Sequence, residues 1–367
     1  MNNRLLSLDA FRGITVAGMI LVNNPGSWSH IYPPLRHAEW NGCTPTDLVF
    51  PFFLFIVGVS IHFGYQSKVA DGLTKDVFLK ILKRTLIIFA LGVFLSLFPR
   101  FNFEVVRIPG VLQRIAVVFF FASILYLKTN WLTQLRVGVV LLLVYYLMMT
   151  LIPVPGVGPP SLEPEANLGA WLDRLLLDGH LWVQSKTWDP EGVLSTMPAI
   201  VTTILGMLTG KLLSSEEQPS DKMVWLFFTG SILIVAGLGW GLFFPINKSL
   251  WTSSYVLYSG GIAMQFLACC YWLIDVKGFK KWAMPFVYYG TNALFVFVVS
   301  GLMVKALARV KISDGDAEIG VLGYVYKYFY ATWLSPVNAS LLYAITLVLI
   351  FLVILRWMYN RKWFVKI

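Results

Sequence analysis

Residues 47–65 read DLVFPFFLFIVGVSIHFGY. After Asp47 this stretch contains no Asp, Glu, Lys or Arg, and it is apolar almost without interruption. A helix needs about 20 mainly apolar residues to cross a hydrocarbon layer of about 30 Å. The stretch therefore predicts a membrane-spanning helix with a carboxylate at its start.

Similar apolar runs recur along the chain. We expect about ten spanning helices, at roughly 6–24, 47–65, 78–98, 110–127, 131–152, 193–213, 223–244, 251–274, 283–308 and 336–359. Strands are not expected within these runs, because an open sheet edge cannot satisfy its backbone groups in lipid. The predicted fold class is an all-α, polytopic helix bundle, which forms a single membrane domain over residues 1–367.

The composition excludes a soluble globular domain, since 57% of residues are hydrophobic, 13% are charged and the mean hydropathy is +0.70. The net charge of +10 does not indicate nucleic-acid binding, because the cations lie where short loops meet helix ends. Asp9 and Arg12 interrupt the apolar core that a cleavable signal peptide would need. Cys43, Cys269 and Cys270 form no spaced pair, so we expect neither a disulfide nor a metal site.

The distribution of cations predicts the orientation. With ten spans both termini share one side, and that side collects 18 of the 29 Lys and Arg residues. The positive-inside rule makes this side cytoplasmic, in a bacterial inner membrane. The 25–46 loop and the long 153–192 loop then face the periplasm. A loop of such length is typical of a functional segment, and we expect residues 168–177 within it to form a short amphipathic helix.

His37 lies in the first of these loops, ahead of Asp47. A histidine is well suited to act as a general base near neutral pH, although a solvated loop histidine is the simpler interpretation. Asp47 either caps the helix that it begins or accepts a hydrogen bond from His37 and raises its basicity. Asn23 and Asn24 end the first helix, and their amides either terminate that helix or donate to an oxyanion.

Other polar residues lie at the boundaries of later helices. Asp189 and Glu191 precede the 193–213 helix, where they either cap that helix or bind the amine of a sugar. Gln113 and Arg114 lie one turn into the fourth helix, where an unpaired charge is costly, so we expect them to line a cavity.

Six segments together resemble the heparan-α-glucosaminide N-acetyltransferase family. They are SLDAFRG (7–13), HAEWNG (37–42), DLVFP (47–51), IPGVLQR (108–114), DPEG (189–192) and PINK (245–248), in the order that the family has them. The resemblance implies that acetyl-CoA enters from the cytoplasm and that its acetyl group reaches a glucosamine amine on the periplasmic side. It also implies that His37 is the catalytic histidine, with Asp47 and Asn23 lining the same site. Because lysosomal members carry a further lumenal domain, we expect this chain to be a bacterial catalytic core.

The predicted activity is therefore a transmembrane N-acetyltransferase with His37 as general base, and an acetyl-histidine relay is the alternative mechanism. We expect the acceptor to bind near Asn24, Trp40, Asp189, Glu191, Asn247 and Lys248. We expect acetyl-CoA, the acetyl donor, to bind near Arg12, Gln113, Arg114, Lys211 and Asn292. In this interpretation Arg12 either contacts a phosphate or pairs with Asp9, and Asn292 lies inside the ninth helix.

Two other functions are compatible with part of this pattern. An O-acyltransferase acting on an envelope polysaccharide would use the same donor and a histidine base, but a hydroxyl acceptor. A secondary transporter would need internal repeats and polar residues near the middle of its helices, and no convincing repeat is present. The expected partners are the lipid bilayer, acetyl-CoA, an amino-sugar or glycan acceptor and, from the family, a second copy in a homodimer, but no nucleic acid.

Overall fold

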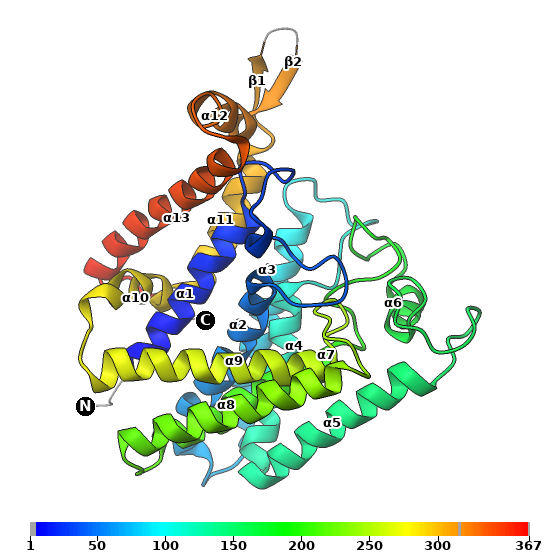
Figure 1. The fold of residues 1–367 in the computed structure, drawn as a ribbon, viewed down its shortest axis with the longest axis vertical. Coiled ribbons are helices and arrows are strands. Elements are labelled where there is room, and N and C mark those ends of the chain that lie inside the picture. Colours follow the sequence, from blue (N-terminus) through cyan, green and yellow to red (C-terminus); the bar gives the residue numbers. More distant parts are fainter. Residues whose placement is uncertain (1–4, 315–316, 366–367) are drawn as a thin grey trace. The chain divides into compact units, whose positions relative to one another are not determined.

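The computed structural model of the chain describes residues 5–314 and 317–365, and the regular secondary structure of this part is almost entirely helical (Figure 1). The helices are α1 (Leu6–Asn23), α2 (Val49–Tyr65), α3 (Lys75–Leu97), α4 (Val111–Lys128), α5 (Trp131–Leu151), α6 (Leu168–Leu177), α7 (Thr196–Ser214), α8 (Pro219–Gly241), α9 (Ser253–Tyr271), α10 (Met284–Thr291), α11 (Ala293–Leu307), α12 (Val321–Phe329) and α13 (Pro336–Asn360). A two-stranded antiparallel hairpin, β1 (Lys311–Asp314) and β2 (Ala317–Gly320), lies between α11 and α12. Arg4 and Lys366, which were counted with the cytoplasmic cations, lie outside the described residues.

The prediction of a polytopic membrane bundle is confirmed. Within the described residues, eight helices are long and apolar enough to cross a membrane, and each corresponds to a predicted span. The predicted ninth span is a bent pair, α10 and α11, whose axes meet at 71°. The predicted third span, α3, is 23 residues long but contains Lys80, Lys83 and Arg84 near its start, so its crossing stays a prediction.

The chain divides into two compact units. The first comprises the described parts of Met1–Ala38, Thr44–Phe50 and Cys269–Lys366. The second comprises Glu39–Cys43 and Pro51–Ala268.

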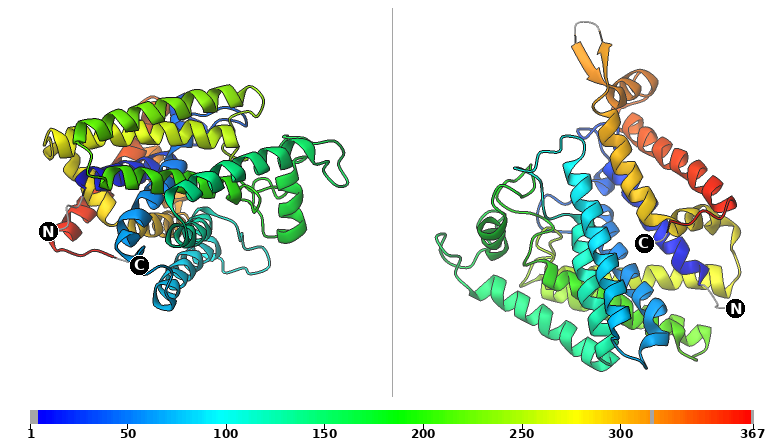
Figure 2. Two further views of the ribbon diagram at one scale, coloured as in Figure 1. Left: turned by 90° about the horizontal axis from the view of Figure 1, so that it is seen from below. Right: turned by 180° about the vertical axis from the view of Figure 1, so that it is seen from behind.

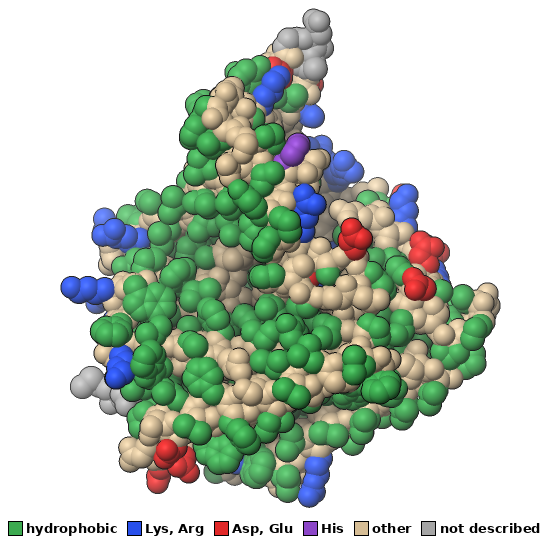
Figure 3. All heavy atoms as spheres, in the orientation of Figure 1, with side chains coloured by type: hydrophobic (Ala, Val, Ile, Leu, Met, Phe, Trp, Pro, Cys, Tyr) green, Lys and Arg blue, Asp and Glu red, His purple; other side chains and the backbone are tan. Residues whose placement is uncertain are grey.

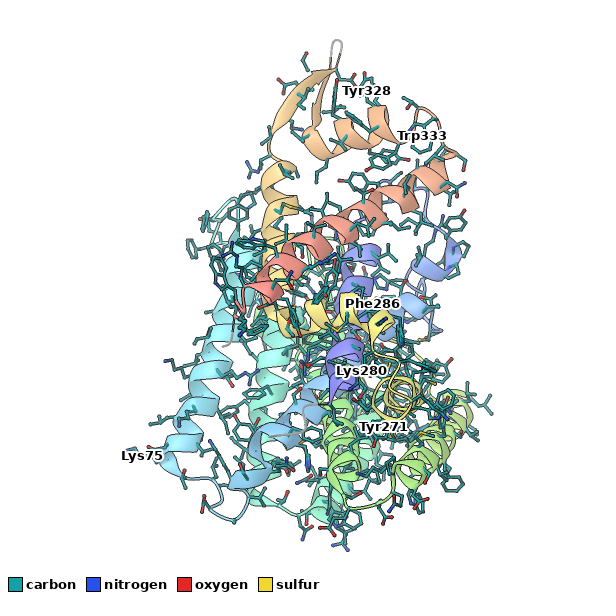
Figure 4. All side chains as sticks on the ribbon, turned by 90° about the vertical axis from the view of Figure 1, so that its left-hand side faces the viewer. Lys75, Tyr271, Lys280, Phe286, Tyr328 and Trp333 are labelled. Atoms are coloured by element: carbon teal, nitrogen blue, oxygen red, sulfur yellow. The ribbon has the colours of Figure 1, made fainter. Side chains whose placement is uncertain are left out.

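In the first unit α1 packs directly against α10, because glycines allow the two backbones to touch. A Cβ added to Gly13 would lie 1.7 Å from the carbonyl oxygen of Phe286, which Figure 4 labels on α10. A Cβ added to Gly290 would lie 1.9 Å from the carbonyl oxygen of Asp9. Asp275 then holds the start of α1, since its carboxylate accepts the backbone N–H groups of Leu6 (3.3 Å) and Ser7 (3.1 Å). These N–H groups have no partner within the helix, and a carboxylate at this end is stabilised by the helix dipole.

In the second unit the same principle joins other helix pairs. Gly58 of α2 lies against α7, where an added Cβ would come within 2.0 Å of the carbonyl oxygen of Thr203. α8 and α9 lie side by side (Figures 1 and 2), and a Cβ on Gly237 would be 2.6 Å from the backbone nitrogen of Tyr258. Small residues are typical of such interfaces in membranes, because helices there associate through close packing.

The outward faces of the spanning helices are apolar. Figure 3 shows apolar side chains covering α5 and α8. On α8 the exposed apolar residues include Val224, Phe228, Val235 and Leu238. Such a surface is stable when lipid, rather than water, is the solvent.

Two features of the last hundred residues were not predicted from the sequence. Asn292 does not lie inside a continuous helix but at the break between α10 and α11. There its amide donates to the carbonyl of Trp363 (3.1 Å) and accepts from the backbone N–H of Val365 (2.9 Å), so its side chain is committed to the C-terminal segment. The segment between the last two predicted spans, for which no prediction was made, forms the β1–β2 hairpin and α12.

Replacing Gly13 with Ala is expected to lower thermal stability in detergent. The added methyl group must displace α10 backbone, and overpacking of this kind costs about 1–3 kcal/mol or more. Gly18→Ala in the same helix is the control, because its added Cβ would meet only the Val49 side chain at 3.9 Å. Thermal unfolding followed by tryptophan fluorescence measures both. A Gly13→Ala protein as stable as the control would contradict the close α1–α10 packing.

Candidate functional site

His37 and Asp47 form a hydrogen-bonded pair in the first unit. The Nδ1 atom of His37 lies 2.7 Å from Oδ1 of Asp47. The Asp47 side chain is 2% exposed, whereas that of His37 is 48% exposed. When Nδ1 carries the ring proton and donates it in this hydrogen bond, Nε2 is the basic nitrogen of the ring. The pairing predicted from the sequence is therefore present.

The other oxygen of Asp47 shapes the loop around this pair. Its Oδ2 accepts the backbone N–H groups of Ala38 (3.0 Å) and Thr44 (3.0 Å) and lies 3.1 Å from the Thr44 hydroxyl. A short 3-10 turn, Pro45–Leu48, places Asp47 in this position just before α2. Asp47 is therefore the N3 residue of a capping box whose N-cap is Thr44, rather than the N-cap itself, and its other oxygen pairs with His37.

Thr44 is a member of this site that the sequence interpretation missed. Its hydroxyl donates to the carbonyl oxygen of Arg36 at 2.6 Å, next to His37. It therefore ties the segment that carries His37 to the turn that carries Asp47. The spacing of Thr44 and Asp47 matches a capping box, and this signal in the sequence identifies Thr44.

The loop before His37 is held by the start of α13. The backbone N–H groups of Gly26 and Ser27 bond to the carbonyl oxygen (3.2 Å) and the hydroxyl (3.0 Å) of Ser340. The Tyr32 hydroxyl donates to the Asn338 side chain at 2.6 Å. Residues more than 300 positions apart in the chain thereby define the path of this loop.

The two asparagines at the end of α1 differ in their surroundings. The Asn24 amide donates to the carbonyl oxygen of Ile20 at 2.8 Å, which is the helix-terminating role. Asn23, the last residue of α1, is exposed. A role for either amide at an oxyanion stays a prediction.

In the second unit Asp189 and Glu191 share one arginine, Arg107. The guanidinium group binds Asp189 in a bidentate manner, with Nε–Oδ2 and Nη2–Oδ1 distances of 2.8 and 2.5 Å. Its Nη2 also donates to Glu191. Burial raises the pKa of Asp189 and opposes the effect of Arg107 upon it. Burial by itself lowers the pKa of Arg107, but its bonds to the two acids outweigh this and the pKa is raised.

This arrangement changes the interpretation of the two acids. A sugar amine that binds Asp189 or Glu191 must share them with Arg107, which the sequence interpretation did not assign to the site. Arg107 directly precedes the IPGVLQR segment, so its position next to a motif was the available signal.

Arg114 and Asp173 surround the same segment. Arg114 is buried, and its Nη2 donates to the Gly192 carbonyl (3.0 Å) and to the Ser195 hydroxyl.

On α6, the helix predicted within the long loop, Asp173 accepts the backbone N–H of Val193 at 2.8 Å. Burial raises the pKa of Asp173 to about 6. Residues 189–195 are thus held by three side chains from separate parts of the chain, Arg107, Arg114 and Asp173.

Comparison with known proteins identifies the family. A family model described as "Heparan-alpha-glucosaminide N-acetyltransferase, catalytic" matches residues 4–245. The chain belongs to this family. Heparan-alpha-glucosaminide N-acetyltransferase of Mus musculus is 33% identical over 355 residues, which cover 81% of this chain and 53% of that protein. The Homo sapiens protein of the same name is 33% identical over 353 residues, which cover 80% of this chain and 52% of that protein. The chain thus spans about half the length of these relatives.

The range matched by the N-acetyltransferase family model contains both groups of residues described above. The His37–Asp47 pair of the first unit and the Arg107–Asp189 pair of the second unit lie within it. The hairpin, α12 and α13 lie beyond its last residue, 245.

Several other predicted site residues have defined partners. The Asn247 amide donates to the Asn41 side chain (3.2 Å) and accepts the backbone N–H of Leu250 (2.9 Å).

The indole of Trp40 donates to the Leu162 carbonyl at 3.0 Å. Its ring meets the edge of Trp188, with 5.1 Å between centroids. Lys248, which follows Asn247, is partly exposed. The acceptor-binding role of these residues stays a prediction.

The residues predicted to bind acetyl-CoA lie in both units. In the first, Arg12 pairs with Asp9 at 3.0 Å, as the spacing predicted, and also donates to the Gly290 carbonyl at 3.3 Å. In the second, Nζ of Lys211 lies 4.9 Å from the centre of the Trp131 ring. Gln113 is buried at the start of α4.

Among the described residues, no group of three or more His, Cys, Asp or Glu side chains is arranged to hold a metal ion.

Replacing Asp173 with Asn is expected to stabilise the protein increasingly as pH rises from about 4 to about 6. The pKa of Asp173 is raised from 3.8 to about 6 in the folded protein. Below pH 3.8 the carboxyl group is protonated in both the folded and the unfolded protein, so folding stability is not reduced. As pH rises from there through about 6, the folded protein must carry a buried charge and loses stability relative to the unfolded protein. The amide oxygen of the introduced side chain can still accept the Val193 bond, but the amide never ionises. The gain is at most about 3 kcal/mol.

The melting temperatures of wild type and Asp173→Asn, measured from pH 4 to pH 7, check this expectation. Asp178→Asn, at an exposed position just after α6, is the matched control and should follow the wild type. A constant difference between Asp173→Asn and wild type at all pH values would refute the titration of Asp173.

Proposed function

We propose that this chain is a transmembrane N-acetyltransferase that moves an acetyl group from cytoplasmic acetyl-CoA to the amine of a glucosamine-type sugar on the periplasmic side. The observation that carries the proposal is the His37–Asp47 pair, in which a buried carboxylate orients a half-exposed imidazole at 2.7 Å. Membership of the N-acetyltransferase family supports the reaction type. The cation distribution supports an inner-membrane location with both termini in the cytoplasm. A homodimer is proposed from the family resemblance.

In the proposed reaction His37 is the general base. Its Nε2 accepts a proton as the sugar nitrogen attacks the thioester carbonyl and the new N–C bond forms. Asp47 stabilises the resulting imidazolium and keeps the ring in one tautomer. When the C–S bond breaks, the imidazolium returns the proton to the leaving thiolate. Asn23 is proposed to donate to the carbonyl oxygen while it carries negative charge.

His37→Ala is expected to lower the rate of glucosamine acetylation at least about 100-fold, because a general base contributes about 10²–10⁴ in rate. His30→Ala is the control, since His30 is an exposed histidine of the same loop, 3.3 Å from the Ser27 hydroxyl. It should leave the rate within about twofold. Mass spectrometry of the acetylated sugar measures both, with acetyl-CoA binding as a test of folding. Near-normal turnover in folded His37→Ala would eliminate His37 as the base.

The acceptor is tested in the same assay. Glucosamine should gain an acetyl group, whereas N-acetylglucosamine and glucose, which lack a free amine, should not. Acetylation of glucose at a hydroxyl group would favour the O-acyltransferase alternative.

Thr44→Val is expected to lower kcat by about fivefold to tenfold with little change in the KM for acetyl-CoA. The substitution preserves shape but removes the hydrogen bond to the Arg36 carbonyl, and such a bond contributes about 1 kcal/mol. Thr44→Ser keeps the hydroxyl and should restore most of the rate. Equal rates for the Val and Ser variants would show that the hydroxyl does not position His37.

Direct transfer is distinguished from an acetyl-histidine relay by rapid mixing. Protein mixed with radiolabelled acetyl-CoA, without acceptor, should carry no covalent label if His37 acts only as a base. A labelled protein whose label is lost in His37→Ala would establish the relay.

A further inference from the structure

α12 is an amphipathic helix whose apolar face is partly covered at Val321, Leu322 and Val325 and exposed at its end, at Phe329. At helical spacing, Val321, Leu322, Val325 and Phe329 lie on one face, and Lys327 lies on the opposite face. No residue of α12 is buried. Phe329 is 64% exposed, an unusual state for a phenylalanine on the apolar side of a helix in water.

The aromatic surface continues past the end of α12. Trp333, in the turn that follows, is 64% exposed, and its indole donates to the carbonyl oxygen of Phe329 at 2.6 Å. Figure 4 shows Trp333 together with Tyr328 at this end of the first unit. Phe329 and Trp333 therefore form one aromatic surface, which we call the α12 surface.

Specific contacts hold α12 in place on its polar side. Nζ of Lys327 lies 2.5 Å from Oδ2 of Asp314 in β1, and the Tyr328 hydroxyl donates to the other oxygen of the same carboxylate. These bonds hold the pKa of Asp314 below its usual value. The Tyr326 hydroxyl donates to the carbonyl oxygen of Pro336 at 3.3 Å. The exposed aromatic residues thus belong to an anchored helix.

Chain connectivity places this helix at a membrane boundary. α12 lies between α11, the second half of a candidate span, and α13, which is a candidate span of 25 residues. Trp333 is three residues before Pro336, where α13 begins. The hairpin and α12 lie beyond the same ends of α11 and α13 (Figures 1 and 2). The α12 surface therefore stands where the spanning helices leave the hydrocarbon layer.

We propose that the α12 surface lies in the interfacial layer of the periplasmic leaflet, with Phe329 and Trp333 among the phospholipid headgroups and first acyl carbons. Tryptophan and tyrosine are enriched at this level, because an apolar ring meets the acyl chains while its polar atom stays near water. A short amphipathic helix with a cation on its outer face binds in the same way. The position of both exposed rings beside the start of α13, a candidate span, favours lipid over a glycan.

This attachment bears on the loop that carries His37. Gly26 packs against the Tyr326 ring so closely that an added Cβ would lie 2.4 Å from ring carbon Cδ2. The same loop bonds to Ser340 near the start of α13. A helix fixed at the lipid surface therefore restrains the path of residues 26–27.

Spin labels in the full-length protein test the proposal. Single cysteines are introduced as Phe329→Cys and Trp333→Cys, in a protein that carries Cys43→Ser, Cys269→Ala and Cys270→Ala, and the protein is reconstituted in vesicles of phosphatidylethanolamine and phosphatidylglycerol. The accessibility of each nitroxide to oxygen and to a water-soluble nickel chelate reports its depth.

Val353→Cys on α13, where Val353 is 69% exposed, is the control for lipid. Glu318→Cys on β2 is the control for water.

The ratio of oxygen to nickel accessibility at positions 329 and 333 is expected to exceed that at 318 at least about threefold, and to remain below that at 353. Ratios equal to that at 318 would overturn the proposal. Immobilisation of water-accessible labels by a glucosamine oligosaccharide would overturn it in favour of a glycan surface. Each variant is first checked for an unchanged melting temperature, and glucosamine acetylation is not part of the readout, so the result is independent of the proposed catalytic role.

Discussion

An ionised side chain inside an apolar helix bundle is stable only beside a partner, because burying an unpaired ion costs several kcal/mol. Two buried acids of this protein follow that constraint. Asp9 pairs with Arg12 within α1, and Asp189 pairs with Arg107 across 82 positions of the sequence. The Asp189–Arg107 pairing also joins distant segments, so the need to neutralise charge organises this part of the chain around its polar residues.

Asp47 combines this constraint with the proposed chemistry. One of its oxygens meets the His37 ring, and the other receives backbone N–H groups from both sides of the loop. The carboxylate therefore determines the conformation of the loop and the orientation of the imidazole together. A general base whose ring is oriented before the substrate binds needs little reorganisation during the reaction, which is the condition for efficient proton transfer.

The segments that surround the proposed base extend beyond the range matched by the family model. Ser340 and Asn338 of α13 bind the loop before His37, and Tyr326 of α12 packs on Gly26. The sequence interpretation passed over this region, because α12 is short and its apolar residues do not reach the length of a span. Its role depends on the exposed positions of Phe329 and Trp333, which only the structure reveals.

The sequence by itself determined that this is a polytopic helical membrane protein, where most spans lie and that α6 forms, and it offered the pair with Asp9 as one of two roles for Arg12. These properties depend on length, hydrophobicity and spacing along a single helix, so they can be derived from neighbouring residues. It also predicted the partnership of His37 and Asp47, which are only ten positions apart. Only the tertiary structure decided that Arg107 occupies the two acids and that Asn292 breaks a span to bind the C-terminal segment. Such contacts join residues distant in the chain, and they arise from how the folded segments pack, which no local pattern encodes.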